Sequence, residues 1–325
     1  MVLAAIAGGT SPTLGRSIVT AILKAGNHMP LILSRSKPES YSAPTSQHGA
    51  KIRYVDYSSI PSLTRGLEGV HTVISVLNPT DPAEMLDYHS NLLQAARSAG
   101  CKRFAPSEWE GGPLSKQKVD LLRSKLDVWK MCEESGLECA RFTPGWFMNY
   151  LGQGCPESKK EEGVAGLDDG FMIDYVDIAT GKMTVPLAED GRPAKMSMTE
   201  LGDIGRFVAA ALNLEEGKWE ADMGMVGSTV DLEEVARKAE QVTGRTFEIR
   251  SITKEELKQR EDDLDQRLAE AFSVDALLAK MVVQLMQCAC DEQVGNQIVD
   301  PVLNRLCPDV KPLGVEEYLE RFWTS

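Results

Sequence analysis

Three glycines near the start of the chain have the spacing of a turn that binds a phosphate. Gly8 and Gly9 follow a short apolar run, and Gly15 lies inside a segment of helical period. A dinucleotide-binding turn needs glycine for the tight reversal, for backbone approach to a pyrophosphate, and for close packing of the helix on the strand. Here the middle glycine is absent, and the loop is one residue longer than the form GGTGxxG. Ser11 and Pro12 stand in its place.

The residues of this loop can compensate for the missing glycine. A Ser-Pro pair is typical of an N-cap and a first helical position, so we expect Ser11 to cap the helix and Pro12 to begin it. The helix N-terminus and the loop hydroxyls would then face an anion. An ordinary strand–turn–helix connection that binds nothing is the alternative. The predicted cofactor contacts of this loop are Gly9, Thr10, Ser11, Thr13, Leu14 and Gly15.

The second predicted strand ends in Ser34 and Arg35, where an NAD site carries Asp or Glu on the ribose 2′-hydroxyl. Arg35 lies 20 residues after Gly15 and is followed by Ser36 and Lys37. Two cations and two hydroxyls favour a 2′-phosphate, which a carboxylate would repel. We therefore predict NADPH as the cofactor, with Ser34, Arg35 and Lys37 near its 2′-phosphate. The alternative is that Arg35 is a solvated surface residue.

The elements that would position these residues alternate regularly along the first 150 residues. Short apolar runs predict buried parallel strands, and segments of helical period that end in glycine predict helices between them. The predicted strands are 2–7, 30–34, 51–55, 72–77, 103–105 and 138–143, and the predicted helices are 14–25, 62–67, 85–98 and 119–135. This alternation indicates an α/β fold with a Rossmann-type, doubly wound parallel sheet. We assign residues 1–150 to an NADP-binding Rossmann domain.

After residue 150 the pattern changes to that of a smaller, mostly helical lobe. Residues 152–170 are rich in glycine and charge, and a loop is predicted there. Asp231, with Glu234 three residues later and Gly244 at the end, has the pattern of a capped helix. The other predicted elements are strands at 183–186 and 195–198 and helices at 203–214, 253–267 and 274–290. We assign 151–325 to a substrate-binding lobe, with segments around 183–214 returning to the sheet domain.

Charge and cysteine content exclude several classes of function. The 325 residues include 35 Lys and Arg and 48 Asp and Glu, and the net charge of −13 opposes nucleic-acid binding. Seven cysteines without a CxxC pair predict reduced thiols and no metal site, and the four isolated histidines are expected at the surface. No apolar run approaches the ~20 residues that span a bilayer. We expect a cytoplasmic protein that binds neither nucleic acid nor membrane, and a homodimer stays open.

Several later segments resemble a known family. KRFAPSEW (102–109) is similar to the KRFLPSEFG segment of isoflavone-reductase-like and NmrA-like proteins, which are atypical short-chain dehydrogenases/reductases. SKLDVWKMCEESGLE (124–138) resembles the family's segment with a lysine eleven residues before Gly-Ile or Gly-Leu, and TPGWFMNY (143–150) resembles its GxFxxY segment. MTELGDIGRFVAAAL (198–212) matches a later strand and helix. The resemblance covers most of residues 1–250; the last 75 residues show none.

The resemblance implies a role for one lysine. The family's reductases use a lysine on the helix after the fifth strand as general acid/base and as a contact to the nicotinamide ribose, and Lys125 stands at that position. The alternative is a helix lysine in a salt bridge, with Asp127 or Glu108 as candidate neighbours. Two departures from the family leave the substrate open, because Trp109 replaces Phe and Glu110 replaces Gly.

Further contacts follow from the same resemblance and from the carboxyl edge of a doubly wound sheet, where ligands bind. Asp56 is expected near the adenine, and Leu77 and Asn78 on the nicotinamide side. The aromatic cluster after the sixth strand would pack a flat aromatic substrate against the nicotinamide, or else form a hydrophobic hinge between lobes. The predicted substrate contacts are Ser107, Glu108, Trp109, Trp146, Phe147 and Tyr150.

No tyrosine has a lysine four residues later, so the Tyr-x-x-x-Lys acid/base pair of ordinary short-chain dehydrogenases is missing. We therefore predict an NADPH-dependent reductase of an aromatic or conjugated small molecule in secondary metabolism, with Lys125 supplying or accepting the proton. One alternative is an isomerase of a biosynthetic intermediate that keeps NADP(H) bound without redox chemistry. The other is an NmrA-like regulator that senses the dinucleotide without turning it over.

Overall fold

A parallel six-stranded sheet forms the centre of the N-terminal half of the protein. The computed structural model describes residues 1–35, 50–112, 115–167, 170–291 and 297–324. The strands of the central sheet are β1 (Leu3–Ala7), β2 (Met29–Ser34), β3 (Lys51–Tyr54), β4 (Thr72–Ser75), β5 (Arg103–Ala105) and β6 (Glu138–Cys139). They pair in parallel in the order β3-β2-β1-β4-β5-β6. The predicted Rossmann-type sheet is thus confirmed, and its strand order reverses between β1 and β4.

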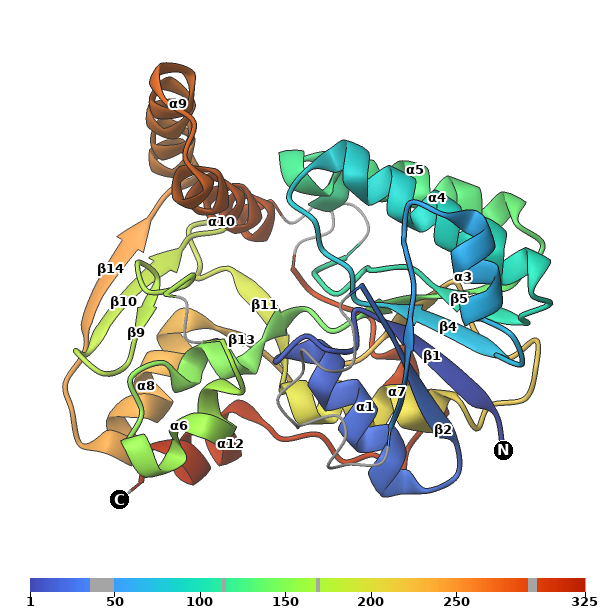
Figure 1. Cartoon of the computed structure of the whole chain (residues 1–325). Helices are drawn as coiled ribbons and strands as arrows, with labels where there is room; N and C mark the ends of the chain where they lie inside the picture. The colour runs from blue at the N-terminus through green and yellow to red at the C-terminus, as the bar shows by residue number, and fades with distance from the viewer. Residues whose placement is uncertain (36–49, 113–114, 168–169, 292–296, 325) are drawn as a thin grey trace.

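Helices cover both faces of this sheet (Figure 1). One face carries α1 (Leu14–Ala25) and α7 (Leu201–Ala211), and the other carries α3 (Ile60–Gly66), α4 (Pro82–Ser98) and α5 (Ser124–Glu134). Helix α7 approaches α1 so closely that a Cβ on Gly205 would lie 2.5 Å from the carbonyl oxygen of Ser17. Because α7 follows residue 150 in the chain, the C-terminal half contributes a layer to the N-terminal sheet.

The C-terminal half combines two small sheets with helices. Its sheets have the orders β14-β10-β9 and β13-β11-β8, and β7 pairs separately with β12. The strands are β7 (Arg141–Thr143), β8 (Trp146–Phe147), β9 (Val176–Asp177), β10 (Lys182–Pro186), β11 (Lys195–Thr199), β12 (Asp222–Gly224), β13 (Ser228–Asp231) and β14 (Glu248–Ile252). The helices are α6 (Glu157–Val164), α8 (Leu232–Thr243), α9 (Lys254–Glu270), α10 (Val274–Cys290), α11 (Val302–Leu306) and α12 (Val315–Trp323).

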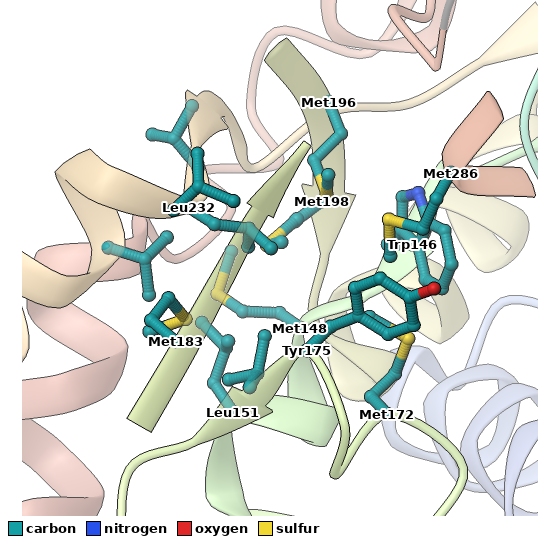
Figure 2. Packing of buried hydrophobic residues seen from close by; sticks show 14 of the residues in the cluster. Trp146, Met148, Leu151, Met172, Tyr175, Met183, Met196, Met198, Leu232 and Met286 are labelled. Atoms are coloured by element: carbon teal, nitrogen blue, oxygen red, sulfur yellow. The ribbon is translucent and has the colours of Figure 1, made fainter. Parts of the chain in front are cut away.

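Methionine fills much of the core in this half. Figure 2 shows part of it, with Trp146 and Tyr175 among the labelled methionines. Methionine is unbranched and polarizable, so it packs well between the irregular surfaces of two small sheets and several helices. Among the described residues, no helix is both long and apolar enough to cross a membrane.

The capped helix predicted from Asp231 is confirmed. The Asp231 side chain accepts a hydrogen bond from the backbone N–H of Glu234, and Gly244 ends α8 in the left-handed conformation. The loop predicted at 152–170 is wrong in part, because α6 forms within it. This helix buries only Gly163 and Val164 and therefore shows no apolar stripe. The Tyr318 hydroxyl of α12 donates to the Gly163 carbonyl at 2.6 Å and helps to hold the helix in place.

Two further predicted elements are broken. The helix predicted at 119–135 divides into a 3-10 turn at Asp120–Leu122 and α5, and the strand predicted at 138–143 divides into β6 and β7. β6 pairs with β5 and β7 with β12, so the hydrogen-bonding partner changes at Ala140. The surface position predicted for the histidines is wrong for His89, which is buried under α4.

Candidate active site at the carboxyl edge of the sheet

The glycine turn after β1 places the N-terminus of α1 at the carboxyl edge of the sheet. Gly8 has a φ of +80°, in the left-handed region that favours glycine. A Cβ on Gly15 would lie 2.7 Å from the carbonyl oxygen of Gly8 and 3.0 Å from the Cα of Gly9. Only glycine lets the helix approach the turn this closely, which is what a dinucleotide-binding turn requires of its last glycine.

The helix begins later than the Ser-Pro pair predicts. Its N-cap is Thr13 rather than Ser11, and no side chain caps it. The backbone N–H of Arg16 donates to the Ser11 carbonyl at 2.9 Å, and the Ser11 and Thr13 hydroxyls lie 2.9 Å apart. The extra loop residue is thus absorbed in one more turn ahead of α1. The first N–H groups of a helix have no intrahelical partner, so this end of α1, with two hydroxyls beside it, fits a phosphate.

The other predicted cofactor residues follow the neighbouring strands at the same edge. Ser34 ends β2 and is buried, while Arg35 is exposed, with its guanidinium carbon 5.9 Å from the ring centroid of Tyr88. Lys37 lies outside the described residues. Asp56, after β3, is exposed and accepts hydrogen bonds from the hydroxyl and the N–H of Ser58, which hold its pKa below the usual range. Leu77 and Asn78 follow β4.

A cavity of about 380 Å³ lies beside these loops. Ligand pockets of drug-sized molecules start at roughly 300 Å³, so this one suits a small organic molecule. Six residues that the sequence singles out line it together: Asn78, Trp109, Lys125, Trp146, Phe147 and Tyr150. The loop after β4, the loop after β5, α5 and β8 each contribute to this wall, and the sheet edge is what brings them together.

The rest of the cavity wall was not predicted. Helix α10 contributes apolar side chains, and Phe171, Glu110, Gly111 and Gln297 come from loops. The α10 residues in the wall are Leu278, Met281 and Leu285. The helical period of 274–290 identifies the helix but not what it packs against. Gln297 carries no sequence signal, because a single polar residue in a loop is the commonest feature of any chain.

Lys125 is 3% exposed and lies in the cavity wall. Its Nζ is 2.7 Å from Oε2 of Glu110, the residue that replaces the family's glycine. Glu110 is therefore its ion-pair partner, and not Asp127 or Glu108 as the salt-bridge alternative expected. The pair places an ammonium and a carboxylate side by side at the surface of the cavity.

Two more buried charges lie behind this pair. Lys116 is 1% exposed and Glu108 is 0% exposed. Nζ of Lys116 is 2.6 Å from Oε2 of Glu108 and 3.7 Å from Oε1 of Glu110, so the four side chains form a row of alternating sign with no net charge. Burial raises the pKa of Glu108 and outweighs the attraction of Lys116. Burial lowers the pKa of Lys116, but the two carboxylates raise it more, and the net direction is upward.

The structure places Ser107 and Glu108 behind the cavity rather than in its wall, where substrate contacts are predicted. The N–H of Ser107 donates to Nε2 of His89 at 3.3 Å, and the Ser75 hydroxyl donates to the same nitrogen at 3.0 Å. Nδ1 of His89 faces the Met85 carbonyl at 2.9 Å, so the proton is on Nδ1. Burial lowers the pKa of His89 to about 4. A neutral histidine thus joins the loops after β4 and β5.

Trp109 has a structural contact as well as a place in the cavity wall. Its indole N–H donates to the Ser75 carbonyl at 2.8 Å, and its ring stacks on Phe142 with centroids 5.6 Å apart. The replacement of the family's phenylalanine by tryptophan therefore adds a hydrogen bond that holds the loop after β5 to the end of β4.

The doubly wound sheet, the glycine turn and the cavity at the strand-order reversal define a Rossmann-type α/β protein with a ligand site at its sheet edge. The chain belongs to the NmrA-like family, whose sequence model matches residues 3–319. The resemblance stated from the sequence is thereby confirmed.

The chain is similar to oxidoreductases and reductases. It is 32% identical over 254 residues to oxidoreductase BOA1 of Botryotinia fuckeliana, covering 76% of this chain and 78% of that protein. It is 24% identical to the isoflavone reductase homolog IRL of Zea mays, covering 98% of this chain and 97% of that one. Leucoanthocyanidin reductase of Vitis vinifera, solved as a binary complex with NADPH, has the same fold, with a TM-score of 0.68, 20% identity and coverage of 98% and 99%.

Proposed function

We propose that the protein is an NADPH-dependent reductase of an aromatic or conjugated small molecule. The observation that carries the proposal is Lys125 in the wall of a largely apolar cavity, at the sheet edge where the glycine turn lies. The name of the 32%-identical relative, an oxidoreductase, supports the reaction class. The NADPH complex of a protein with the same fold supports the cofactor, and so do the close approach of Gly15 to Gly8 and the position of Arg35.

NADPH supplies a hydride when bound. The chain itself would hold the pyrophosphate at the N-terminus of α1 and the 2′-phosphate at Arg35. Lys125 would give a proton to the reduced substrate, and Glu110, 2.7 Å away, orients its ammonium group. Three aromatic rings offer flat surfaces in the wall: the Phe147 and Tyr150 centroids lie 6.4 Å apart, and those of Tyr150 and Phe171 5.5 Å apart.

The isomerase alternative has one observation in its favour. Lys125 and Glu110 present an acid and a base 2.7 Å apart at one cavity, and an isomerisation needs a proton removed from one atom and returned to another. A regulator that only senses the dinucleotide would need neither a buried lysine nor an apolar cavity beside it, so we place that reading third.

The test combines product analysis with one pair of variants. The protein is incubated with NADPH and a panel of aromatic enones, ketones and lactones, and both cofactor absorbance and product mass are followed. We expect NADPH consumption matched by products two mass units heavier. Products of unchanged mass with NADPH intact would favour the isomerase, and binding without products the sensor.

Lys125→Met should lower kcat by about 100-fold or more, because a positioned acid contributes roughly 10²–10⁴-fold. Lys130→Met is the matched control, since Lys130 lies exposed on the same helix. Its kcat should stay near that of the wild type. Full activity of Lys125→Met would remove this lysine from the chemistry.

A further inference from the structure

Two side-chain N–H groups in the cavity wall have no hydrogen-bond partner. They are Nε1 of Trp146 and Nε2 of Gln297, both from residues that line the cavity. Trp146 is 6% exposed and Gln297 is 1% exposed. A buried donor without a partner costs roughly 1–3 kcal/mol, and folded proteins keep few of them. Two in the wall of one cavity therefore indicate that a ligand supplies the missing acceptor.

Both donors are held by the same strand. Trp146 lies in β8 opposite Met198 of β11. The Gln297 carbonyl accepts from the N–H of Ser197, one residue earlier in β11, and the Ser197 hydroxyl accepts from the N–H of Val299 at 3.0 Å. Neighbouring positions on one paired strand thus fix the two backbones, so their side-chain donors are preorganised relative to each other.

The glutamine amide also lies next to the residue that holds the predicted acid. A Cβ on Gly111 would stand 2.2 Å from Oε1 of Gln297 and 2.9 Å from its Cδ, so the amide rests directly on the glycine backbone. Gly111 follows Glu110, whose carboxylate pairs with Lys125. The lack of a side chain at position 111 is therefore what admits the amide to this side of the cavity.

The charges around the cavity determine which acceptor fits. Among the described residues of its wall, the charged side chains are Lys125 and Glu110, and they neutralise each other. Two neutral N–H donors in an apolar wall bind a neutral oxygen well. They offer no excess positive charge to offset the desolvation of a carboxylate or phosphate.

We propose that Trp146 and Gln297 form a subsite that binds a neutral carbonyl oxygen of the substrate. The subsite rests on the proposed function for its place in a reaction, and it narrows the substrate class to uncharged aromatic ketones, enones and lactones. Both donors bind the oxygen of the ground-state substrate, so they act on affinity and orientation.

The experiment measures binding with NADP⁺ present, so that no turnover occurs. The probes are matched pairs: chalcone with 1,3-diphenylpropene, and other aryl ketones and lactones with their deoxy or cyclic ether counterparts. The proteins are the wild type, Trp146→Phe, Gln297→Met, and Trp129→Phe as control. The control loses an indole N–H that bonds Glu133 on α5, outside the cavity wall. Thermal melts verify that each variant is folded.

We expect the wild type to bind carbonyl members more tightly than their partners. Each cavity variant should lose about three- to tenfold of that preference, the equivalent of one net hydrogen bond, and Trp129→Phe should keep it. Binding of deoxy partners should change little in Gln297→Met. The subsite is overturned if no carbonyl compound outcompetes its partner, or if both variants keep the wild-type preference. A wild type that shows the preference but never consumes NADPH would overturn the reductase and leave the subsite standing.

Discussion

Replacing Lys116 by methionine tests the row of buried charges behind the cavity. Methionine nearly preserves the length of the side chain but removes the charge that lies 2.6 Å from Oε2 of Glu108. Glu108 is fully buried and would lose its ion-pair partner. Removing one partner of a buried pair costs about 3–5 kcal/mol, because the charge that stays behind is uncompensated. We expect Lys116→Met to lower the free energy of unfolding by an amount of this order at neutral pH.

The loss should depend on pH. Burial already raises the pKa of Glu108, and removal of Lys116 raises it further. A carboxyl whose pKa is raised on folding binds more protons in the folded state. Its contribution to stability is therefore complete below the unfolded pKa and is lost as the pH rises through the folded value. Protonating an ordinary glutamate costs about 1 kcal/mol at pH 5 and about 3.7 kcal/mol at pH 7, and this cost caps the penalty.

The assay is urea denaturation at pH 5 and pH 7 of the wild type, Lys116→Met, Glu108→Gln and the double variant. The loss from Lys116→Met should be about 3 kcal/mol smaller at pH 5 than at pH 7, and adding Glu108→Gln should recover most of it at pH 7. Lys130→Met, an exposed control, should change stability by less than about 0.5 kcal/mol. Equal losses at both pH values, or additive losses in the double variant, would refute the reasoning.

Three other changes test the cofactor end of the site. Arg35→Ala should weaken NADPH binding about tenfold or more and leave NADH binding unchanged in fluorescence titrations, and comparable affinities for both cofactors in the wild type would sink the 2′-phosphate assignment. Gly15→Ala brings a Cβ within 2.7 Å of the Gly8 carbonyl, so thermal melts should show a loss of about 1–3 kcal/mol together with weaker NADPH binding. The pKa of His89 is lowered to about 4, so its contribution to stability is present above the usual histidine range and is lost as the pH falls toward 4. His89→Gln should flatten that part of the stability–pH curve, and an unchanged slope would show that His89 does not cause it.

The sequence predicts the central sheet well because its signals are local. Each strand is a short apolar run, and each following helix shows its own period and ends near a glycine, so neither needs knowledge of a distant partner. The strand predicted at 138–143 fails for the opposite reason. Its second half pairs with β12 at Asp222–Gly224, about eighty residues later, and nothing within the run marks the point where the partner changes.

The site divides along the same line. Residues that follow strands, such as Asn78 and Lys125, can be placed at the cavity from order and spacing alone. The ion pair of Lys125 with Glu110 could not, since Glu110 is visible in the sequence only as a departure from a family pattern. Lys116 could not either, because a lysine in a polar stretch gives no sign that its charge will be buried between two carboxylates.

This division bears on how such a protein acquires its substrate. The cofactor turn, Arg35 and Lys125 come from the half of the chain that resembles the family. The far wall of the cavity, α10 and Gln297, comes from the last 75 residues, where the sequence shows no resemblance. Hydride and proton transfer require the same atoms in the same places whatever the substrate, whereas shape and acceptor recognition must follow each molecule. We therefore expect exchanges within 274–297 to alter which carbonyl compound binds while NADPH binding persists.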